Sequence, residues 1–240
     1  MKKYKRRFDE GIKIDNDKIT FDYSDNEGVN ISLNKMKNFI AHSKSQKGKI
    51  ISLYSITTEN KQILRALKNE GNLKIDVDDL KYFALRSAMF AYHNIKNKNI
   101  DYIIYNENTY PFLDIFINIL SKKFSSKVLK VNNDVFKTGT ENIQLKKDIP
   151  DSLKTELNKI LLNLRKKKSI KLRNDIIPRY RKFFTGFLDI SSSLKEKIEG
   201  KSVLYIDDIF TTGSTFKEVF SILENANVSD IQGLSIFKFK

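Results

Sequence analysis

Hydrophobic residues recur at helical spacing in the segment that begins at residue 76. Asp76 stands where a helix N-cap is expected, and Asp79 takes the third helical position in place of the more usual Glu. An apolar stripe follows with the 3.6-residue spacing of one helix face. Its members are Leu80, Phe83, Ala84, Ser87, Ala88, Ala91 and Tyr92. The pattern therefore predicts an amphipathic helix from Asp76 onward.

Two compact apolar runs after this helix predict strands with another helix between them. Residues 101–105 and 127–131 are short runs rich in β-branched and aromatic side chains. Between them, Pro111 suits the first turn of a helix. The buried face of that helix is expected to comprise Leu113, Phe116, Ile117 and Leu120. Strand, helix and strand at this spacing form a βαβ unit, which predicts a parallel sheet.

A long, mostly polar insert at about residues 132–200 interrupts this alternation. One helix is expected within it, at 152–164, followed by a basic run at 165–168. An insert of this length inside a compact domain is usually functional or disordered. The alternation then resumes with three elements: a strand at 203–207, a helix at 214–225 and a last strand at 231–237.

The first 75 residues contain shorter elements. Residues 18–23 and 49–56 alternate as strands do, and residues 60–68 have the apolar spacing of a helix. No Pro- or Gly-rich linker separates this part from the rest. We therefore expect residues 1–75 to form an N-terminal α+β lobe, a hood or partner surface, packed on a main domain at 76–240.

The composition excludes several kinds of site. The chain has no Cys, so disulfides, thiolate metal sites and Cys nucleophiles are excluded. His42 and His93 are too far apart for ligand spacing, so neither a zinc enzyme nor a His-based triad is expected. No run of 18 apolar residues occurs, and no apolar segment follows the basic N-terminus. We expect a cytoplasmic protein with no membrane partner.

The charge indicates the chemistry of a partner. Lys and Arg number 44 and Asp and Glu 29, which gives a net charge of +15. Such an excess favours an anionic partner, either nucleic acid or a phosphorylated metabolite, although a solvated basic surface explains it equally well.

The stretch at residues 202–215 carries the most specific chemistry. A buried strand would deliver Asp207 and Asp208 to its carboxyl end, where ligands bind in open α/β sheets. Gly213 lets the backbone close on a phosphate, and the N–H groups of residues 211–215 with the next helix dipole form an anion cradle. Further donors are the hydroxyls of Thr211, Thr212, Ser214 and Thr215. Acids beside such a cradle suit a sugar phosphate. A strand that ends in solvated acids before a Thr/Ser helix cap explains single residues but not the whole string.

This stretch, with its hydrophobic run, Asp207-Asp208, Thr211-Thr212-Gly213 and Thr215, resembles the phosphoribosyl pyrophosphate (PRPP) signature of type I phosphoribosyltransferases. The resemblance implies an α/β fold, with a twisted parallel sheet of about five strands, flanking helices and a variable hood. It also implies magnesium-dependent PRPP binding. The 5′-phosphate would lie in the loop 211–215, the two acids would hold the ribose hydroxyls, and Mg²⁺ would be held through the ligand rather than directly by the protein.

Within that family the chain is most similar to ComF-like proteins. Residues 184–187 (FTGF) and 200–201 (GK) precede the signature much as corresponding elements do in that group. Three features differ. The zinc-finger cysteines typical of ComF proteins are absent, the first 75 residues resemble no family, and the loop at 106–110 lacks Pro and small residues.

The residues expected on the pyrophosphate side of the site share a position after the first two strands of the main domain. They are Asn106, Glu107, Asn108, Thr109 and Lys130. Glu107 would repel pyrophosphate unless it binds metal or points away.

The basic insert supplies cations for a closing loop over the leaving pyrophosphate. The candidates are Lys171, Arg173, Arg179 and Arg181, beside Lys166, Lys167, Lys168 and Lys182. A solvated face and a nucleic-acid patch are the alternatives. Interleaved Tyr180, Phe183 and Phe184 would suit base stacking, but aromatic residues at this spacing more often belong to a core.

Two functions follow from these features. The first is a magnesium-dependent phosphoribosyltransferase that uses PRPP and a nitrogenous acceptor, or runs the reverse reaction on a nucleotide. The second is an inactive protein of the same fold that binds a nucleotide or nucleic acid as a regulatory or partner module. Either could act as a homo-oligomer or in a complex with other proteins.

Overall fold

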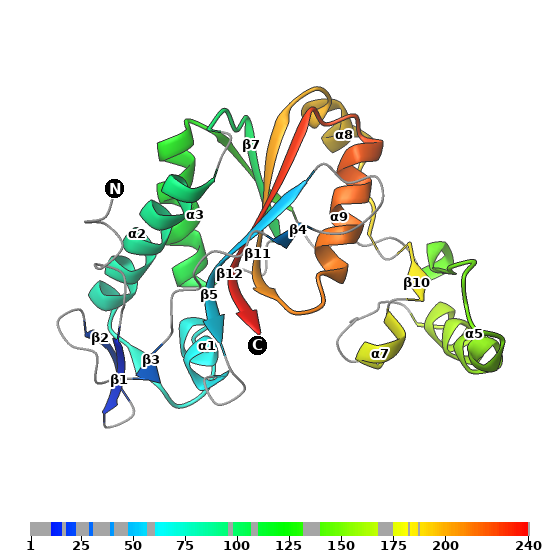
Figure 1. Cartoon of the computed structure of the whole chain (residues 1–240), viewed down its shortest axis with the longest axis horizontal. Coiled ribbons are helices and arrows are strands. Elements are labelled where there is room, and N and C mark those ends of the chain that lie inside the picture. Colours follow the sequence, from blue (N-terminus) through cyan, green and yellow to red (C-terminus); the bar gives the residue numbers. More distant parts are fainter. Residues whose placement is uncertain are drawn as a thin grey trace.

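The centre of the molecule is a twisted sheet with helices on both faces (Figure 1). The structure is a computed structural model that describes residues 11–15, 18–22, 29–30, 39–40, 48–56, 61–95, 98–106, 110–131, 140–167, 175–181, 183–186 and 188–239. The strands are β1 (Gly11–Asp15), β2 (Lys18–Asp22), β3 (Val29–Asn30), β4 (Phe39–Ile40), β5 (Lys49–Ile56), β6 (Lys74–Ile75), β7 (Tyr102–Asn106), β8 (Lys127–Val131), β9 (Gln144–Leu145), β10 (Phe184–Thr185), β11 (Ser202–Phe210) and β12 (Asp230–Phe239). The helices are α1 (Lys61–Leu67), α2 (Val77–Asn94), α3 (Pro111–Phe124), α5 (Asp151–Arg165), α7 (Pro178–Arg181), α8 (Ser192–Ile198) and α9 (Ser214–Asn225), with a 3-10 turn η2 (Thr140–Asn142).

The central sheet has the strand order β4-β5-β12-β11-β7-β8. Its neighbouring strands are parallel except for β4, which runs antiparallel to β5. The predicted α/β class, a mostly parallel sheet flanked by helices, is confirmed. The resemblance implied about five strands. The described part of the sheet has six because β4 and β5, which precede residue 76, extend it beyond β12.

The segment before residue 76 contributes to two sheets. β5 pairs with β12 from Lys49↔Gln232 to Ile56↔Phe239. β1, β2, β3 and β6 form a separate sheet, in the order β3-β1-β2-β6. The strands predicted at 18–23 and 49–56 and the helix predicted at 60–68 are confirmed as β2, β5 and α1.

Different helices cover the two faces of the central sheet. On one face, Leu204 and Ile206 of β11 share a core with buried residues of α1, α2 and α3. On the other, Val203 and Tyr205 pack with α8 and α9. This alternation is the period of a strand, and burial on both sides explains why β11 begins as an unbroken hydrophobic run.

Asp76 occupies the N-cap position of α2 as predicted, but its side chain accepts no hydrogen bond from the first helical turn. Its carboxylate instead forms an ion pair with Lys18 Nζ on β2, at 2.5 Å. The Asp side chain therefore links the small sheet to α2 rather than capping the helix. Among the described residues, no helix has the length and apolarity needed to cross a membrane.

The insert is more structured than its polar sequence suggested. The predicted helix is α5, and η2, α7 and the β9–β10 pair lie around it; we call these elements the insert unit. They share a small core of Ile143, Leu157, Leu161, Leu164, Ile176, Tyr180 and Phe184. Tyr180 and Phe184 are 5% and 3% exposed, so these two rings belong to that core and are not available for base stacking. In Figure 1, α5 and α7 lie beyond α9, away from the central sheet.

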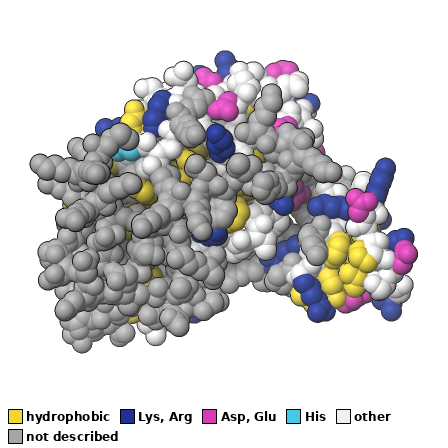
Figure 2. Space-filling model, viewed as in Figure 1, with side chains coloured by type: hydrophobic (Ala, Val, Ile, Leu, Met, Phe, Trp, Pro, Cys, Tyr) yellow, Lys and Arg dark blue, Asp and Glu magenta, His cyan; other side chains and the backbone are white. Residues whose placement is uncertain are grey.

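The surface of the insert unit mixes basic and apolar side chains. Leu162 and Ile177 are 58% and 54% exposed. Figure 2 shows hydrophobic side chains gathered on this part of the surface, with Lys and Arg side chains around them.

Gly233 of β12 sets how closely α9 approaches the sheet. A Cβ there would lie 2.9 Å from ring atoms of both Phe216 and Phe220. We expect Gly233→Ala to destabilise the protein by about 1–3 kcal/mol, because the rings must shift in a packed core. Urea denaturation measures this effect. In a Phe216→Leu background the cost should be smaller, since one of the two rings is gone. Equal costs in both backgrounds would show that the close packing is not the cause.

Candidate functional site

The two adjacent acids lie in the last part of β11, which is longer than predicted. The strand continues to Phe210, and Asp207 still pairs in register with Ser235 of β12. Both carboxylates are half-buried at the carboxyl edge of the parallel sheet. The backbone N–H of Asp208 donates to Asp207 Oδ1 at 2.9 Å. The strand ladder therefore fixes the backbone positions from which both side chains project.

The electrostatics of this pair favour a neutral Asp207. Burial, and then the nearby charge of Asp208, raise the pKa of Asp207 from 3.8 to about 8, against the smaller opposing effects of the Asp208 N–H and Lys68. An ionised pair at this position thus works against folding, and a ligand that donates hydrogen bonds to the carboxylates would relieve the repulsion.

The predicted phosphate loop has the backbone geometry that its sequence suggested. Gly213 has φ +72° and forms the N-cap of α9. A Cβ at this position would lie 2.8 Å from Phe210 Cζ, so the site excludes a side chain on steric grounds as well. The N–H groups of the first turn of a helix have no partner within the helix, and the dipole favours an anion there.

The hydroxyl groups of the loop are accessible to a ligand. Thr211, Thr212 and Thr215 are exposed, and Ser214 is half-buried. The Thr212 and Ser214 hydroxyls form a hydrogen bond with each other at 2.9 Å. Phe210 packs against Phe216 of α9, with ring centroids 5.8 Å apart, and so anchors the loop on both sides. That the loop binds a phosphate stays a prediction.

Two residues that the sequence analysis did not single out lie beside the acids. Lys68, directly after α1, forms an ion pair with Asp208. Its Nζ lies 5.5 Å from the centroid of the Tyr110 ring. Tyr110 is the N-cap of α3 and is 6% exposed. Neither position has a local signal in the sequence, because each is brought to the site by the order of the strands.

The predicted pyrophosphate side is described only in part. Glu107, Asn108 and Thr109 lie outside the described residues. Asn106 ends β7, the strand next to β11. Lys130 lies on β8, with β7 between it and the acid-bearing strand. The structure therefore places the Asn106 backbone nearer to the acids than that of Lys130.

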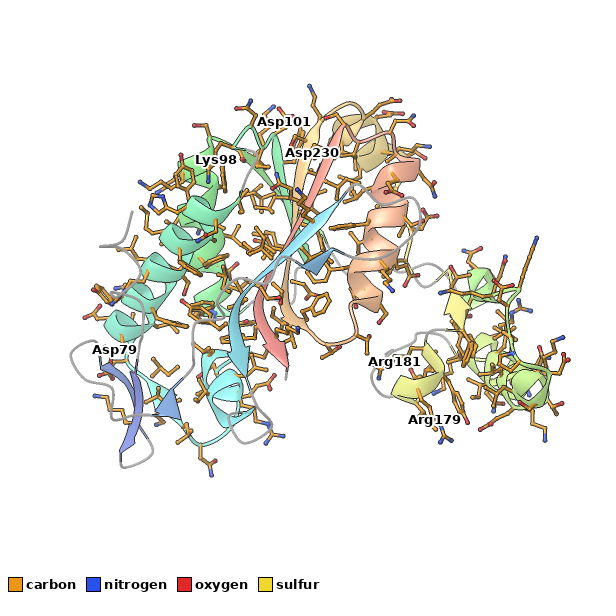
Figure 3. All side chains as sticks on the ribbon, in the orientation of Figure 1. Asp79, Lys98, Asp101, Arg179, Arg181 and Asp230 are labelled. Atoms are coloured by element: carbon orange, nitrogen blue, oxygen red, sulfur yellow. The ribbon has the colours of Figure 1, made fainter. Side chains whose placement is uncertain are left out.

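Only some of the cations predicted for a closing loop are among the described residues. Lys171 and Arg173 lie outside the described residues, as do Lys168 and Lys182. Arg179 and Arg181 lie on α7 (Figure 3). Both line a cavity of about 790 Å³ together with Thr212 and Ser214. Arg181 Nε donates to Ile176 O at 3.1 Å, and the Arg179 guanidinium lies 4.6 Å from the centroid of the Tyr180 ring. These two arginines thus share a cavity with the phosphate loop, whereas Lys167 pairs with Asp175.

The same cavity carries further charge. Lys146 and Lys217 contribute two cations, and Asp189 and Glu218 two acids. With the two arginines, the lining has four cationic and two acidic side chains, and this excess favours an anion.

A metal held directly by the protein is not indicated among the described residues. No group of three or more His, Cys, Asp or Glu side chains gathers there. Two half-buried carboxylates beside an anion cradle are compatible with Mg²⁺ that keeps most of its contacts to substrate phosphates and water. Magnesium binding through the ligand stays a prediction.

The chain matches no protein-family model and no curated protein sequence. Among solved structures, 62 chains match it. The hypoxanthine phosphoribosyltransferase of Trypanosoma cruzi, complexed with the product IMP, has 12% identity and a TM-score of 0.35, over 67% of this chain and 64% of that one. The glutamine PRPP amidotransferase of B. subtilis has 12% identity and a TM-score of 0.35, over 70% of this chain and 28% of that one.

A third structure, the purine phosphoribosyltransferase of Pyrococcus horikoshii, has 12% identity and a TM-score of 0.34, over 65% of this chain and 84% of that one. The chain therefore spans under two thirds of the Trypanosoma and B. subtilis proteins. Likeness at this distance does not decide a function, and the site residues must do so.

The pKa of Asp207 makes a stability prediction. Because its folded-state pKa lies above the unfolded value, the unfolded chain releases this proton at lower pH, and stability falls as pH rises from about 4 to 8. We expect Asp207→Asn to be more stable than wild type at pH 8 by on the order of 2 kcal/mol. Near pH 4 the difference should almost vanish. Chemical denaturation at both pH values measures it, and a difference that grows on acidification would contradict the raised pKa.

Proposed function

We propose that this protein binds PRPP and acts as a magnesium-dependent phosphoribosyltransferase. It would transfer ribose 5-phosphate from PRPP to a nitrogenous acceptor, or run the reverse reaction on a nucleotide. The observation that carries this proposal is the junction of β11 and α9. Two carboxylates at the end of β11 and an anion cradle at the start of α9 are separated by a short loop that turns at Gly213.

The distribution of groups suits the two ends of a ribose 5-phosphate. Loop N–H groups and hydroxyls would hold the 5′-phosphate, while Asp207 and Asp208 would accept hydrogen bonds from the ribose hydroxyls. Breaking the bond between C1 and pyrophosphate leaves a cationic sugar and an anionic leaving group. The carboxylates would favour the cationic sugar, and cations beside the site would favour the leaving pyrophosphate. When bound, Mg²⁺ would neutralise part of the pyrophosphate charge.

The first test is calorimetric titration of PRPP with Mg²⁺. We expect wild type to bind and the double variant Asp207→Asn/Asp208→Asn to lose at least about tenfold in affinity, because both carboxyl groups that would accept the ribose hydrogen bonds become amides. Pyrophosphate release in the presence of a panel of nucleobases then tests turnover. Absence of binding by wild type would contradict the proposal.

The phosphate loop has its own test. Gly213→Val introduces a β-branched side chain at positive φ and against Phe210, so it should reduce PRPP affinity by at least about tenfold. Gly200→Val is the matched control, because Gly200 also has positive φ, +67°, but a Cβ there meets nothing within 4 Å. Both variants carry the backbone strain, and only the first alters the loop. Equal PRPP affinities in the two variants would contradict the assignment of the loop.

The second candidate is a nucleotide- or nucleic-acid-binding module without turnover. The cavity between α7 and α9 favours it, because Arg179, Arg181, Lys146 and Lys217 line one space. For a nucleic-acid ligand, Arg179→Ala/Arg181→Ala should weaken binding and flatten the slope of log affinity against log salt by up to about two phosphates' worth. Binding that survives Asp207→Asn/Asp208→Asn would separate this function from the first.

A further inference from the structure

The ion pair between Lys68 and Asp208 joins a helix of the N-terminal part to the acid-bearing strand. The two side chains are 24% and 22% exposed, so the pair is partly shielded from water. Lys68 Nζ also lies near the face of Tyr110, 5.5 Å from the ring centroid. One ammonium group therefore contacts Asp208 and lies near Tyr110, the residue at which the chain enters α3.

Tyr110 adds a second, independent observation. Its hydroxyl is buried and has no hydrogen-bond partner among the described residues. Burial first, and then the charges of Asp208 and Asp207, raise the pKa of Tyr110. The hydroxyl thus stays protonated, and it interacts electrostatically with both acids. A buried donor without a partner is unfavourable unless a ligand completes it.

The two faces of the sheet define how a ribose phosphate could span this edge. Tyr110 and Leu67, which precedes Lys68, belong to the core on the face of α1, α2 and α3. Phe210 and Phe216, which flank the phosphate loop, belong to the core on the face of α8 and α9. A ribose that lies across Asp207 and Asp208 with its 5′-phosphate in the loop would direct C1 toward the first of these faces.

We propose that Lys68 and Tyr110 form the pyrophosphate-contacting side of the site, and that Lys68 exchanges Asp208 for pyrophosphate when PRPP binds. In the free protein the ammonium neutralises Asp208. When the ribose hydroxyls occupy the acids, the ammonium turns to the pyrophosphate, and the Tyr110 hydroxyl donates to the same group. Lys130 lies on β8, one strand farther from β11 than Tyr110's neighbour β7. This inference rests on the proposed PRPP-binding function.

The experiment compares three ligands by calorimetry: ribose 5-phosphate, inorganic pyrophosphate with Mg²⁺, and PRPP with Mg²⁺. Lys68→Met should weaken PRPP and pyrophosphate binding by about tenfold or more and leave ribose 5-phosphate within about twofold. Lys68→Arg, which keeps the charge, should stay within about threefold of wild type for all three ligands. Lys81→Met is the control, because it removes an exposed lysine of α2 and changes the net charge equally.

Tyr110→Phe provides a test that does not disturb the ion pair. It removes only the buried hydroxyl, so the fold should be retained, and PRPP binding should weaken by about threefold or more while ribose 5-phosphate binding is unchanged. If Lys68→Met fails to fold, Lys68→Arg and Tyr110→Phe decide the matter.

The outcomes separate this inference from the proposed function. Wild type that binds neither ribose 5-phosphate nor PRPP would overturn both. Wild type that binds PRPP, with Lys68→Met and Tyr110→Phe unaltered, would overturn this inference alone. An equal loss for ribose 5-phosphate and PRPP in Lys68→Met would also overturn it, because Lys68 would then merely support Asp208.

Discussion

The parallel pairing of β11 between β12 and β7 is the constraint on which the rest of the structure depends. Both neighbours run in the same direction as β11, so three carboxyl ends meet at one edge of the sheet. The first five residues of β11 are buried, and its last four are half-buried but still part of the strand. The ladder thus carries two carboxylates out of the core while it holds their backbone in place. A loop could not fix them with the same precision.

The half-buried position of the two carboxylates destabilises the fold. Two adjacent carboxylates in a half-buried place raise the energy of the ionised pair, and the raised pKa of Asp207 expresses that strain. Lys68 offsets part of it through its ion pair with Asp208. Tyr110 destabilises the fold for a different reason, because its hydroxyl is buried without a described hydrogen-bond partner. Departures from good packing and pairing are expected at sites that bind ligands, and here they fall within one group of contacts.

Local sequence patterns predicted most elements of the main domain. The helix at 214–225 matches α9, the strand at 49–56 matches β5, and Pro111 begins α3. The prediction that Tyr180 and Phe184 belong to a core is confirmed, because both pack in one cluster with buried leucines of α5. β11 was predicted to end at Asp207, but it continues to Phe210 and its last residues still pair with β12. The two adjacent acids interrupt the hydrophobic run, so the sequence pattern does not reveal that the strand continues.

The contacts of the site were not predictable in the same way. Lys68 and Tyr110 approach Asp208 because of strand order, and hydrophobic periodicity contains no information about which strands become neighbours. The unusual backbone conformation of Gly213 was predictable because a residue without a Cβ, directly before a helix, is a local signal. The cavity shared by Arg179, Arg181 and the phosphate loop depends on where α7 lies relative to α9, which is again non-local.

The position of β5 explains how the N-terminal part reaches the site. β5 is parallel to β12, so its carboxyl end lies at the same edge of the sheet as the ends of β11 and β7. α1 begins at Lys61, and a helix of its seven residues spans only about 10 Å. Lys68, directly after it, pairs with Asp208 at that edge. The N-terminal residues thus supply both β5, the outer neighbour of β12, and Lys68, the partner of Asp208. Removing them would expose a strand edge and leave a half-buried carboxylate without its cation. The acid pair is therefore tied to the N-terminal segment by hydrogen bonding in the sheet and by charge at its edge.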